Sequence, residues 1–249
     1  MRMFLSTLFH KSLKQYKGPG SVAIPKNPAE WPASWKRIEY KSYGNLSQVG
    51  LPDSLATSLS KSIAARKSTR SYTAKPLSLH TLSHLLRYSC GEVGGAVDNA
   101  RKRRAQPSGG AMFPIETYVL VFRSSLELPS GVYHYAVATH SLDILWQRSF
   151  TAEEIGQLYI YEKVQDAAAA IVMTSVFARN QQKYGERGYR LALIEAGHIG
   201  QNVYLLSAEL GLGCCAMAGS YDHAIESILG IDGVTESVVY SVIVGEPKR

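Results

Sequence analysis

One long segment, residues 188–210, constrains the fold more than any other part of the chain. It contains no proline, and apolar side chains recur on one face at helical spacing, while leucine, isoleucine and tyrosine occupy the other faces. A helix that is apolar nearly all round is buried on all sides, either in a large core or between subunits. Arg190, Glu195 and His198 interrupt the pattern, so we do not expect a membrane span. Gly211 marks the end of the predicted helix.

The bulk composition limits the class of protein. A chain of 249 residues can form one large domain or two small ones, and 45% hydrophobic residues support a substantial core. The formal net charge of +7 is modest: it favours an anionic ligand but does not indicate a nucleic-acid-binding protein. Three cysteines are too few for a disulfide framework, and the N-terminus has no signal-peptide pattern. We therefore expect a cytoplasmic protein that binds neither nucleic acid nor membrane.

The N-terminal residues 1–54 are predicted to form an irregular arm, because prolines and glycines leave little room for regular elements. Trp31, Trp35 and Tyr40 make this segment too aromatic for a free tail. We expect it to wrap around the body of the protein or a partner subunit, and a partly disordered tail is the alternative. Residues 55–249 contain no linker and are predicted to form one domain.

The order of elements in that domain predicts an α+β fold with a mainly antiparallel sheet flanked by helices. Ser78 is the expected N-cap of one helix, and Thr151 forms an expected capping box with Glu154 at another. The segments 91–100 and 214–219, rich in small residues, are interpreted as loops. Helices are predicted to begin around residues 55, 79, 152, 188 and 224, and strands to span 116–122, 131–135, 141–146, 167–177 and 236–245.

A basic motif follows the first predicted helix of the domain. Arg66, Lys67 and Arg70 surround the hydroxyl groups of Ser68 and Thr69. A phosphate group needs such charged donors together with hydroxyls, so the motif predicts an anion-binding site. A solvated basic face is the alternative.

A glycine-rich motif occupies residues 107–111. Its glycines let backbone N–H groups approach a flat or anionic ligand, whereas an ordinary tight turn is the alternative. The motif lacks the lysine of a Walker loop and the spacing of a dinucleotide-binding loop. The basic run at 101–104 has no supporting aromatic residues, and His80 and His84 have no acidic third ligand between them, so we predict neither a nucleic-acid patch nor a metal site.

Five short motifs in order resemble the FMN-dependent nitroreductase superfamily, and together they resemble its SagB-type branch of azoline dehydrogenases. The resemblance covers roughly residues 55–247. The motifs are the R-x-S-x-R pattern at 66–70, P-S-G-G-A at 107–111, G-V-Y-H-Y at 131–135, K-Y-G-E-R-G-Y-R at 183–190 and G-H-I-G-Q-N at 197–202.

The resemblance implies an α+β homodimer with two FMN sites at the subunit interface and makes the helix over 188–210 the central dimer helix. It places Arg66 and Ser68 at the FMN phosphate, and Arg70 at the N1/O2 side of the flavin ring. Ser108, Gly109 and Gly110 would contact the ring from the partner subunit, and a backbone N–H in the loop over 216–219 would lie near flavin N5. Many nitroreductases carry Glu at the position of Ala218, so that side-chain contribution is lost here. The cofactor-binding residues implied in this way are Arg66, Lys67, Ser68, Arg70, Pro107, Ser108, Gly109, Gly110, Met217, Ala218, Gly219, Lys248 and Arg249.

The branch resemblance also implies that Lys183 and Tyr184 are catalytic. Oxidation of a thiazoline or oxazoline removes a proton from Cα and a hydride from Cβ, so the reaction needs a base as well as the flavin. Lys183 would be the base, and Tyr184 would orient the heterocycle or Lys183. The alternative is that both residues only cap the surface of the helix. Glu195 and His198 are interpreted as structural residues, satisfied across the dimer, and a role toward the substrate is the alternative.

The sequence therefore predicts an FMN-dependent dehydrogenase that acts on azolines of a modified peptide, with O2 as re-oxidant. A cyclodehydratase and its heterocycle-containing precursor peptide are the expected partners. One alternative is an NAD(P)H-dependent nitro or quinone reductase on the same fold. Another is a flavin-free, non-catalytic subunit of a peptide-modifying complex.

Overall fold

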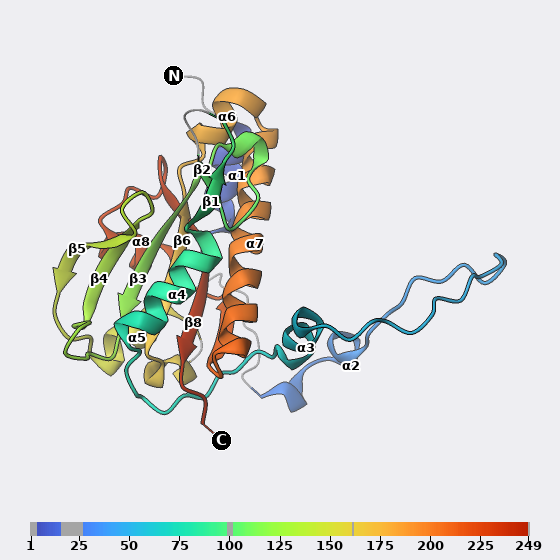
Figure 1. The fold of residues 1–249 in the computed structure, drawn as a ribbon, viewed down its shortest axis with the longest axis horizontal. Coiled ribbons are helices and arrows are strands. Elements are labelled where there is room, and N and C mark those ends of the chain that lie inside the picture. The colour runs from blue at the N-terminus through green and yellow to red at the C-terminus, as the bar shows by residue number, and fades with distance from the viewer. Residues whose placement is uncertain (1–3, 16–26, 99–101, 161, 249) are drawn as a thin grey trace.

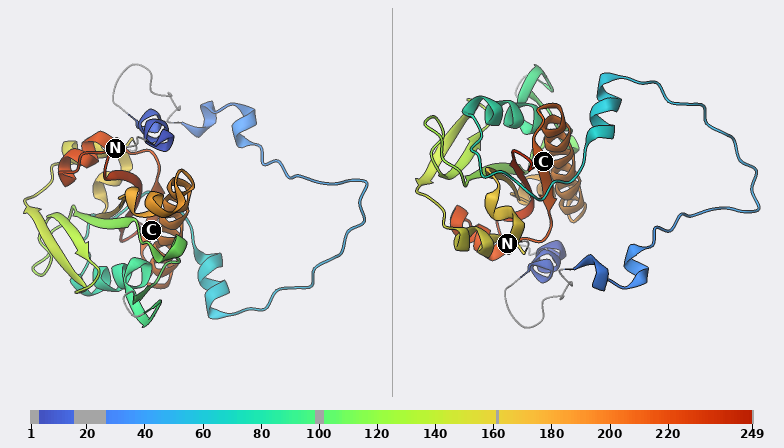
Figure 2. Two further views of the ribbon diagram at one scale, coloured as in Figure 1. Left: turned by 90° about the horizontal axis from the view of Figure 1, so that it is seen from above. Right: turned by 90° about the horizontal axis from the view of Figure 1, so that it is seen from below.

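The structure, a computed structural model, describes residues 4–15, 27–98, 102–160 and 162–248. A single six-stranded sheet forms its centre, with helices on both faces (Figure 1). An extended N-terminal segment projects away from this body in each view (Figures 1 and 2). No helix in these ranges is long and apolar enough to cross a membrane.

The six-stranded sheet has the order β5-β4-β3-β6-β8-β7, and every neighbouring pair is antiparallel. The predicted α+β fold with an antiparallel sheet is thus confirmed. All seven residues of β6 are buried, as expected for a central strand. The strands are β3 (Ile115–Val121), β4 (Gly131–Ala136), β5 (Ser141–Gln147), β6 (Ala169–Ser175), β7 (Gly213–Met217) and β8 (Ser237–Gly245).

Two segments predicted as loops form strands instead. β7 pairs with β8 along its whole length, so the interpretation of residues 214–219 as a loop is wrong up to Met217. Its small residues fit close packing, because a Cβ added at Gly213 would lie 2.7 Å from Thr69. β1 (Glu92–Ala96) pairs with β2 (Lys102–Arg104) around an irregular register, which Gly94 allows at a φ of +90°.

The helices follow the predicted capping signals. The Ser78 hydroxyl accepts from the Thr81 N–H, and Thr151 and Glu154 form the complete capping box. The helices are α1 (Leu5–Leu13), α2 (Ala33–Lys36), α3 (Ser58–Ala65), α4 (Leu79–Cys90), α5 (Ala152–Leu158), α6 (Ala178–Tyr184), α7 (Arg187–Glu209) and α8 (Asp222–Leu229), and the 3-10 turns are Pro28–Glu30, Gly109–Ala111 and Glu162–Asp166.

The sheet separates two hydrophobic cores. Ile171 and Met173 of β6 join the core beneath α4 and α7, whereas Val172 between them joins the core beneath α5 and α8. This follows from the period-two alternation of a strand. β6 is therefore apolar throughout because both of its faces are covered.

Helix α7 is buried on one side only within a single chain. Ala192, Ala196 and Ile199 face the sheet, whereas Leu193 and Ile194 are 37% and 48% exposed. The prediction that this helix is buried on all sides is therefore wrong for a single chain. Its alternative, that the helix lies between subunits, remains a prediction, and the exposed apolar face favours it.

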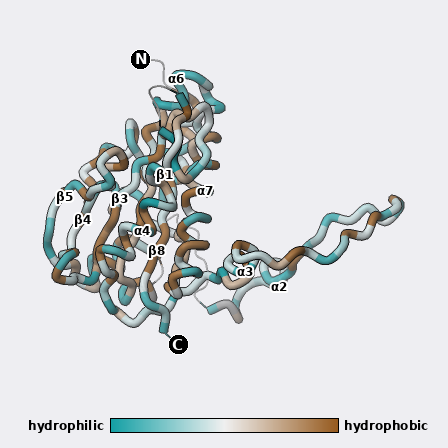
Figure 3. Tube along the Cα trace, viewed as in Figure 1, coloured by the Kyte–Doolittle hydropathy of each residue, from teal (hydrophilic) through white to brown (hydrophobic). Residues whose placement is uncertain are grey.

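The N-terminal segment is more regular than predicted, because α1 packs on the body. His10 contacts the Ser237 hydroxyl at 2.9 Å, and Lys14 forms a buried ion pair with Glu226 at 2.7 Å. Residues 37–57, in contrast, extend away from the body and do not wrap it (Figure 2). Apolar residues along this extension are open to solvent, with Val49 90% exposed (Figure 3). The division at residue 54 stays a prediction.

Candidate functional site

The basic motif extends the edge of the sheet at β7. After α3 the chain runs beside β7, where Ser68 forms a parallel bridge with Cys214 and the Thr69 N–H donates to the Cys214 carbonyl at 2.8 Å. Tyr72 anchors the basic motif to the protein: its side chain is buried, and its hydroxyl donates to the Thr69 carbonyl. The motif is thus held on rigid structure rather than on a free loop.

Tyr204 of α7, which the sequence analysis did not select, connects the motif to the central helix. Its hydroxyl lies 2.9 Å from the Ser68 hydroxyl and accepts from the Ala216 N–H at 2.8 Å. The Arg66 guanidinium stacks 5.3 Å from the centre of the Tyr204 ring. In the sequence, the signal for this residue was a side-chain hydroxyl among the apolar residues of the helix.

The basic motif concentrates positive charge. Arg66, Lys67 and Arg70 form no ion pair within the described ranges of the chain. Arg66 is half-buried, and Lys67 and Arg70 are exposed beside the Ser68 hydroxyl. Unpaired cations and a hydroxyl on fixed backbone suit a phosphate group.

Lys248 and Arg249 were also predicted to bind the phosphate. The Lys248 N–H donates to the Ser71 carbonyl, which brings the C-terminal segment beside the motif, but its ammonium group pairs with Asp166 at 2.9 Å. Arg249 lies outside the described residues. Because Asp166 neutralises Lys248, Lys248 is a weaker anion ligand than the motif itself.

The segment after β7 presents backbone rather than side chains. Met217 is buried in the core beneath α5 and α8, so its side chain is not available to a ligand. Ala218 follows it and is exposed, and the Gly219 carbonyl accepts from the Ile160 N–H at 2.9 Å. A contact through the backbone near Ala218 is compatible with this geometry.

The glycine-rich motif forms a second group, seated on α7 near the opposite end. A Cβ at Gly109 would lie 3.0 Å from Leu191 of α7, so this position has no room for a side chain. Gly110 has a φ of +64°, and its added Cβ would lie 3.0 Å from the Lys183 ammonium and closer still to the Tyr184 hydroxyl. The predicted Lys-Tyr pair therefore lies directly against the glycine loop.

Lys183 and Tyr184 reach the loop because α6 ends there. Gly185, with a φ of +57°, reverses the chain between α6 and α7. The Lys183 ammonium lies 5.3 Å from the centre of the Tyr184 ring, so the two side chains contact each other. Of the pair, Lys183 is exposed and Tyr184 half-buried.

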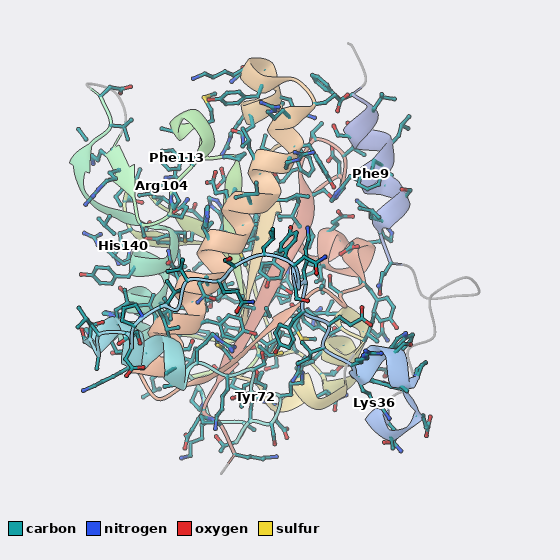
Figure 4. All side chains as sticks on the ribbon, turned by 90° about the vertical axis from the view of Figure 1, so that its right-hand side faces the viewer. Phe9, Lys36, Tyr72, Arg104, Phe113 and His140 are labelled. Atoms are coloured by element: carbon teal, nitrogen blue, oxygen red, sulfur yellow. The ribbon has the colours of Figure 1, made fainter. Side chains whose placement is uncertain are left out.

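The loop that carries Gly110 holds unusual backbone conformations. Ala111 and Phe113 have φ values of +51° and +46°, which side-chain-bearing residues rarely adopt. The Arg104 guanidinium stacks 4.6 Å from the Phe113 ring (Figure 4), and Arg179 donates to the Phe113 carbonyl at 3.1 Å. Such local strain persists only where the surroundings over-determine it, and it is concentrated at binding sites.

The two groups do not meet within one chain. Leu191 touches the glycine loop and Tyr204 touches the basic motif, and at about 1.5 Å per residue these positions lie roughly 20 Å apart along α7. Neither group lines the cavity of about 360 Å³ between α4 and the β4–β5 hairpin. A site that uses both groups would have to span that separation or be completed by a second chain.

This antiparallel α+β fold places the basic motif and the glycine loop at two positions along one central helix. The model of the nitroreductase family matches residues 63–246, and the chain belongs to that family. One relative is protein MJ1384 of Methanocaldococcus jannaschii, named for its likeness to nitroreductases. It is 35% identical over 76% of this chain and 92% of its own length.

Two other relatives are named for peptide processing, which confirms the resemblance to the SagB-type branch. The trifolitoxin-processing protein TfxB of Rhizobium leguminosarum bv. trifolii is 31% identical over 68% of this chain. The microcin B17-processing protein McbC of Escherichia coli is 29% identical over 63% of it. The matched regions span 47% and 57% of those relatives' own lengths.

Solved structures confirm the fold. A chain of the E. coli microcin synthetase McbBCD, solved with truncated pro-MccB17 bound, matches 98% of this chain and 92% of its own length with a TM-score of 0.74 and 22% identity. A nitroreductase-like structure from Anabaena variabilis matches 76% of this chain and 38% of its own length with a TM-score of 0.62 and 27% identity.

Proposed function

We propose that the protein is an FMN-dependent dehydrogenase of the SagB type, which oxidises thiazolines or oxazolines in a modified peptide to azoles. The observation that carries the proposal is the position of Lys183 and Tyr184 against Gly110. This brings a base and a hydroxyl to the loop that the family resemblance assigns to the flavin ring. The peptide-processing relatives support the substrate class.

The residues present fit FMN. Arg66 and Ser68 would hold its phosphate, with Lys67 beside them, because they combine unpaired positive charge with a hydroxyl on fixed backbone. Arg70 would face the flavin ring, and the backbone N–H groups of Gly109 and Gly110 would contact it. When bound, FMN supplies a hydride acceptor at N5.

The chain's own residues would handle the proton. The Lys183 amine would take the proton from Cα of the azoline, and FMN would supply the acceptor for the hydride that leaves Cβ, so the ring loses one proton and one hydride. Tyr184 donates its hydroxyl proton in a hydrogen bond to the heterocycle or to Lys183. O2 would be the oxidant that restores the cofactor, and it would take up two electrons and two protons to give H2O2.

A homodimer would complete the site. The open apolar side of α7 would pair with its copy, placing the basic motif of one chain near the glycine loop of the other. Complementation tests this arrangement. Arg66→Glu and Lys183→Ala chains should each be inactive alone. Expressed together, they should regain about a quarter of the activity, because half of the dimers are mixed and one site of each is intact. If the co-expressed chains are as inactive as each chain alone, the site is not shared between two subunits.

The reaction itself is tested by anaerobic flavin reduction. Purified protein with its visible flavin spectrum is mixed with an azoline-containing peptide or with NADPH. Bleaching by the azoline, slowed in Lys183→Ala while FMN stays bound, supports the proposal. A colourless protein that takes up no FMN would indicate the flavin-free subunit.

An NAD(P)H-dependent nitro or quinone reductase is the second candidate. It is favoured by the match to MJ1384, which covers 92% of that relative, more than for either peptide-processing protein. Rapid bleaching by NADPH in the absence of peptide would establish it. The Lys-Tyr pair would then have only a structural role.

A further inference from the structure

A buried polar pair fixes the start of the glycine loop. Glu195 of α7 is 1% exposed and Gln106 is 2% exposed. The Gln106 Nε2 donates to Glu195 Oε1 at 3.2 Å within one chain. The pairing of Glu195 across a dimer stays a prediction. His198 lies exposed one turn away and takes no part.

The remaining two oxygens of this pair are unsatisfied. Gln106 Oε1 and Glu195 Oε2 are both buried, and neither has a hydrogen-bond partner among the described residues. Both are acceptors if Glu195 is ionised, so they cannot satisfy each other. Leaving a buried polar atom unpaired is costly, and an ionised carboxylate in this position costs more still.

A single proton removes the conflict. Protonated Glu195 carries an O–H donor, and an acid facing an amide can both give and receive a hydrogen bond. We propose that Glu195 is a neutral carboxylic acid that forms a two-point pair with Gln106 and so positions the glycine loop beneath Lys183 and Tyr184. Glu195 is a positioning residue in this scheme, and its role in turnover rests on the proposed function.

The surroundings of Glu195 favour the neutral form. Burial raises the pKa of its carboxyl, and the Ser108 hydroxyl and the Gln106 amide oppose that shift to a smaller extent. The positive charge of Arg104 of β2 also lowers the pKa, by less than either of those two groups. Arg190 and His198 of α7 are exposed, where water screens their charge.

The anchor matters because the loop is strained. Arg179 holds the far end of the loop at the Phe113 carbonyl, and Glu195 holds the near end at Gln106. Between them lie Gly110 and Ala111, both with positive φ. Without the anchor, the loop can relax and withdraw Gly110 from the Lys-Tyr pair.

Two substitutions separate a neutral anchor from a charged one. Glu195→Gln keeps the shape without charge and can form both hydrogen bonds with Gln106. We expect its FMN affinity and turnover to stay within about twofold of wild type, whereas Glu195→Ala should lose about tenfold in each, as expected for one lost buried pair. If Glu195→Gln loses as much as Glu195→Ala, the carboxylate charge is required and the proposal is wrong.

Two further measurements do not depend on turnover. Infrared spectroscopy of the whole protein should show a protonated-carboxyl band that disappears in Glu195→Gln; a wild-type spectrum without that band overturns the proposal. Because the folded pKa is raised, the stabilisation from Glu195 is complete at low pH and is lost as the pH rises through that pKa. The melting temperature of wild type should therefore fall with rising pH relative to that of Glu195→Gln. Melting temperatures that follow the same pH dependence in both proteins would contradict the proposal. Both readouts remain valid even if azolines prove not to be substrates.

Discussion

Substituting Gly110 by alanine separates backbone strain from displacement of the Lys-Tyr pair. Gly110 has φ +64° and ψ +20°, and Gly230 at the end of α8 has the nearly equal values +72° and +27°. An alanine in this left-handed region costs about 1–2 kcal/mol. For a chain of this size, both variants should therefore lose about 2–8 °C in melting temperature.

Only Gly110→Ala should disturb the site. Its Cβ would lie 3.2 Å from the Tyr184 ring carbon that bears the hydroxyl, whereas nothing lies within 4 Å of the corresponding atom at Gly230. A normal carbon–carbon contact of about 3.5–4.0 Å requires Tyr184 to move by at least roughly 0.3–0.8 Å, and the Tyr184 hydroxyl lies closer still to the added Cβ. The Lys183 ammonium, 3.0 Å from the same Cβ, must also shift.

The assay is azoline oxidation by FMN-loaded protein, followed alongside thermal unfolding. A displacement approaching 1 Å of a catalytic group costs about 100-fold in rate. We therefore expect Gly110→Ala to lose about two orders of magnitude in turnover and Gly230→Ala to keep wild-type turnover. Equal turnover in the two variants would refute the placement of Lys183 and Tyr184 against the loop.

The remaining predictions concern the anion site and two structural contacts. Arg66→Ala should raise the FMN Kd about 10–100-fold, because one charge-assisted hydrogen bond is lost. Titration with FMN should give the wild-type Kd for the exposed control Arg37→Ala. Lys14→Met leaves the buried Glu226 carboxylate without its cationic partner and should cost about 3–5 kcal/mol in chemical denaturation. A loss below about 1 kcal/mol would show that α1 is not docked as described. Hydrogen bonding to Glu116 raises the pKa of His134 above 6.5, so its stabilisation is complete below pH 6.5 and lost as the pH rises through that pKa. The difference in unfolding free energy between wild type and His134→Phe should therefore shrink as the pH rises through that pKa. A difference that does not change with pH would contradict this role of His134.

Much of the fold was predictable because its signals are local. The long proline-free apolar segment gave α7, and the hydroxyl caps at Ser78 and Thr151 gave two helix starts. Strand β7 was missed because its small residues resemble a loop, and its strand identity comes only from pairing with β8. Helix α1 was missed because its stability depends on distant partners such as Glu226.

The candidate site was predictable in its parts but not in its arrangement. The motifs around Ser68 and Gly110 are visible as residue types, yet nothing local indicates that they lie roughly 20 Å apart along α7. Tyr204 and Gln106 were missed because each acts through contacts with residues far away in the chain. Long-range pairing of this kind leaves no short-range pattern.

Mass spectrometry of the peptide product tests the central claim most directly. An azoline-containing peptide is incubated with FMN-loaded wild type and with Lys183→Ala under air. The account predicts a loss of two hydrogen atoms per ring with wild type, which requires FMN and is nearly abolished in Lys183→Ala. A peptide of unchanged mass, from a protein that consumes NADPH instead, would contradict it.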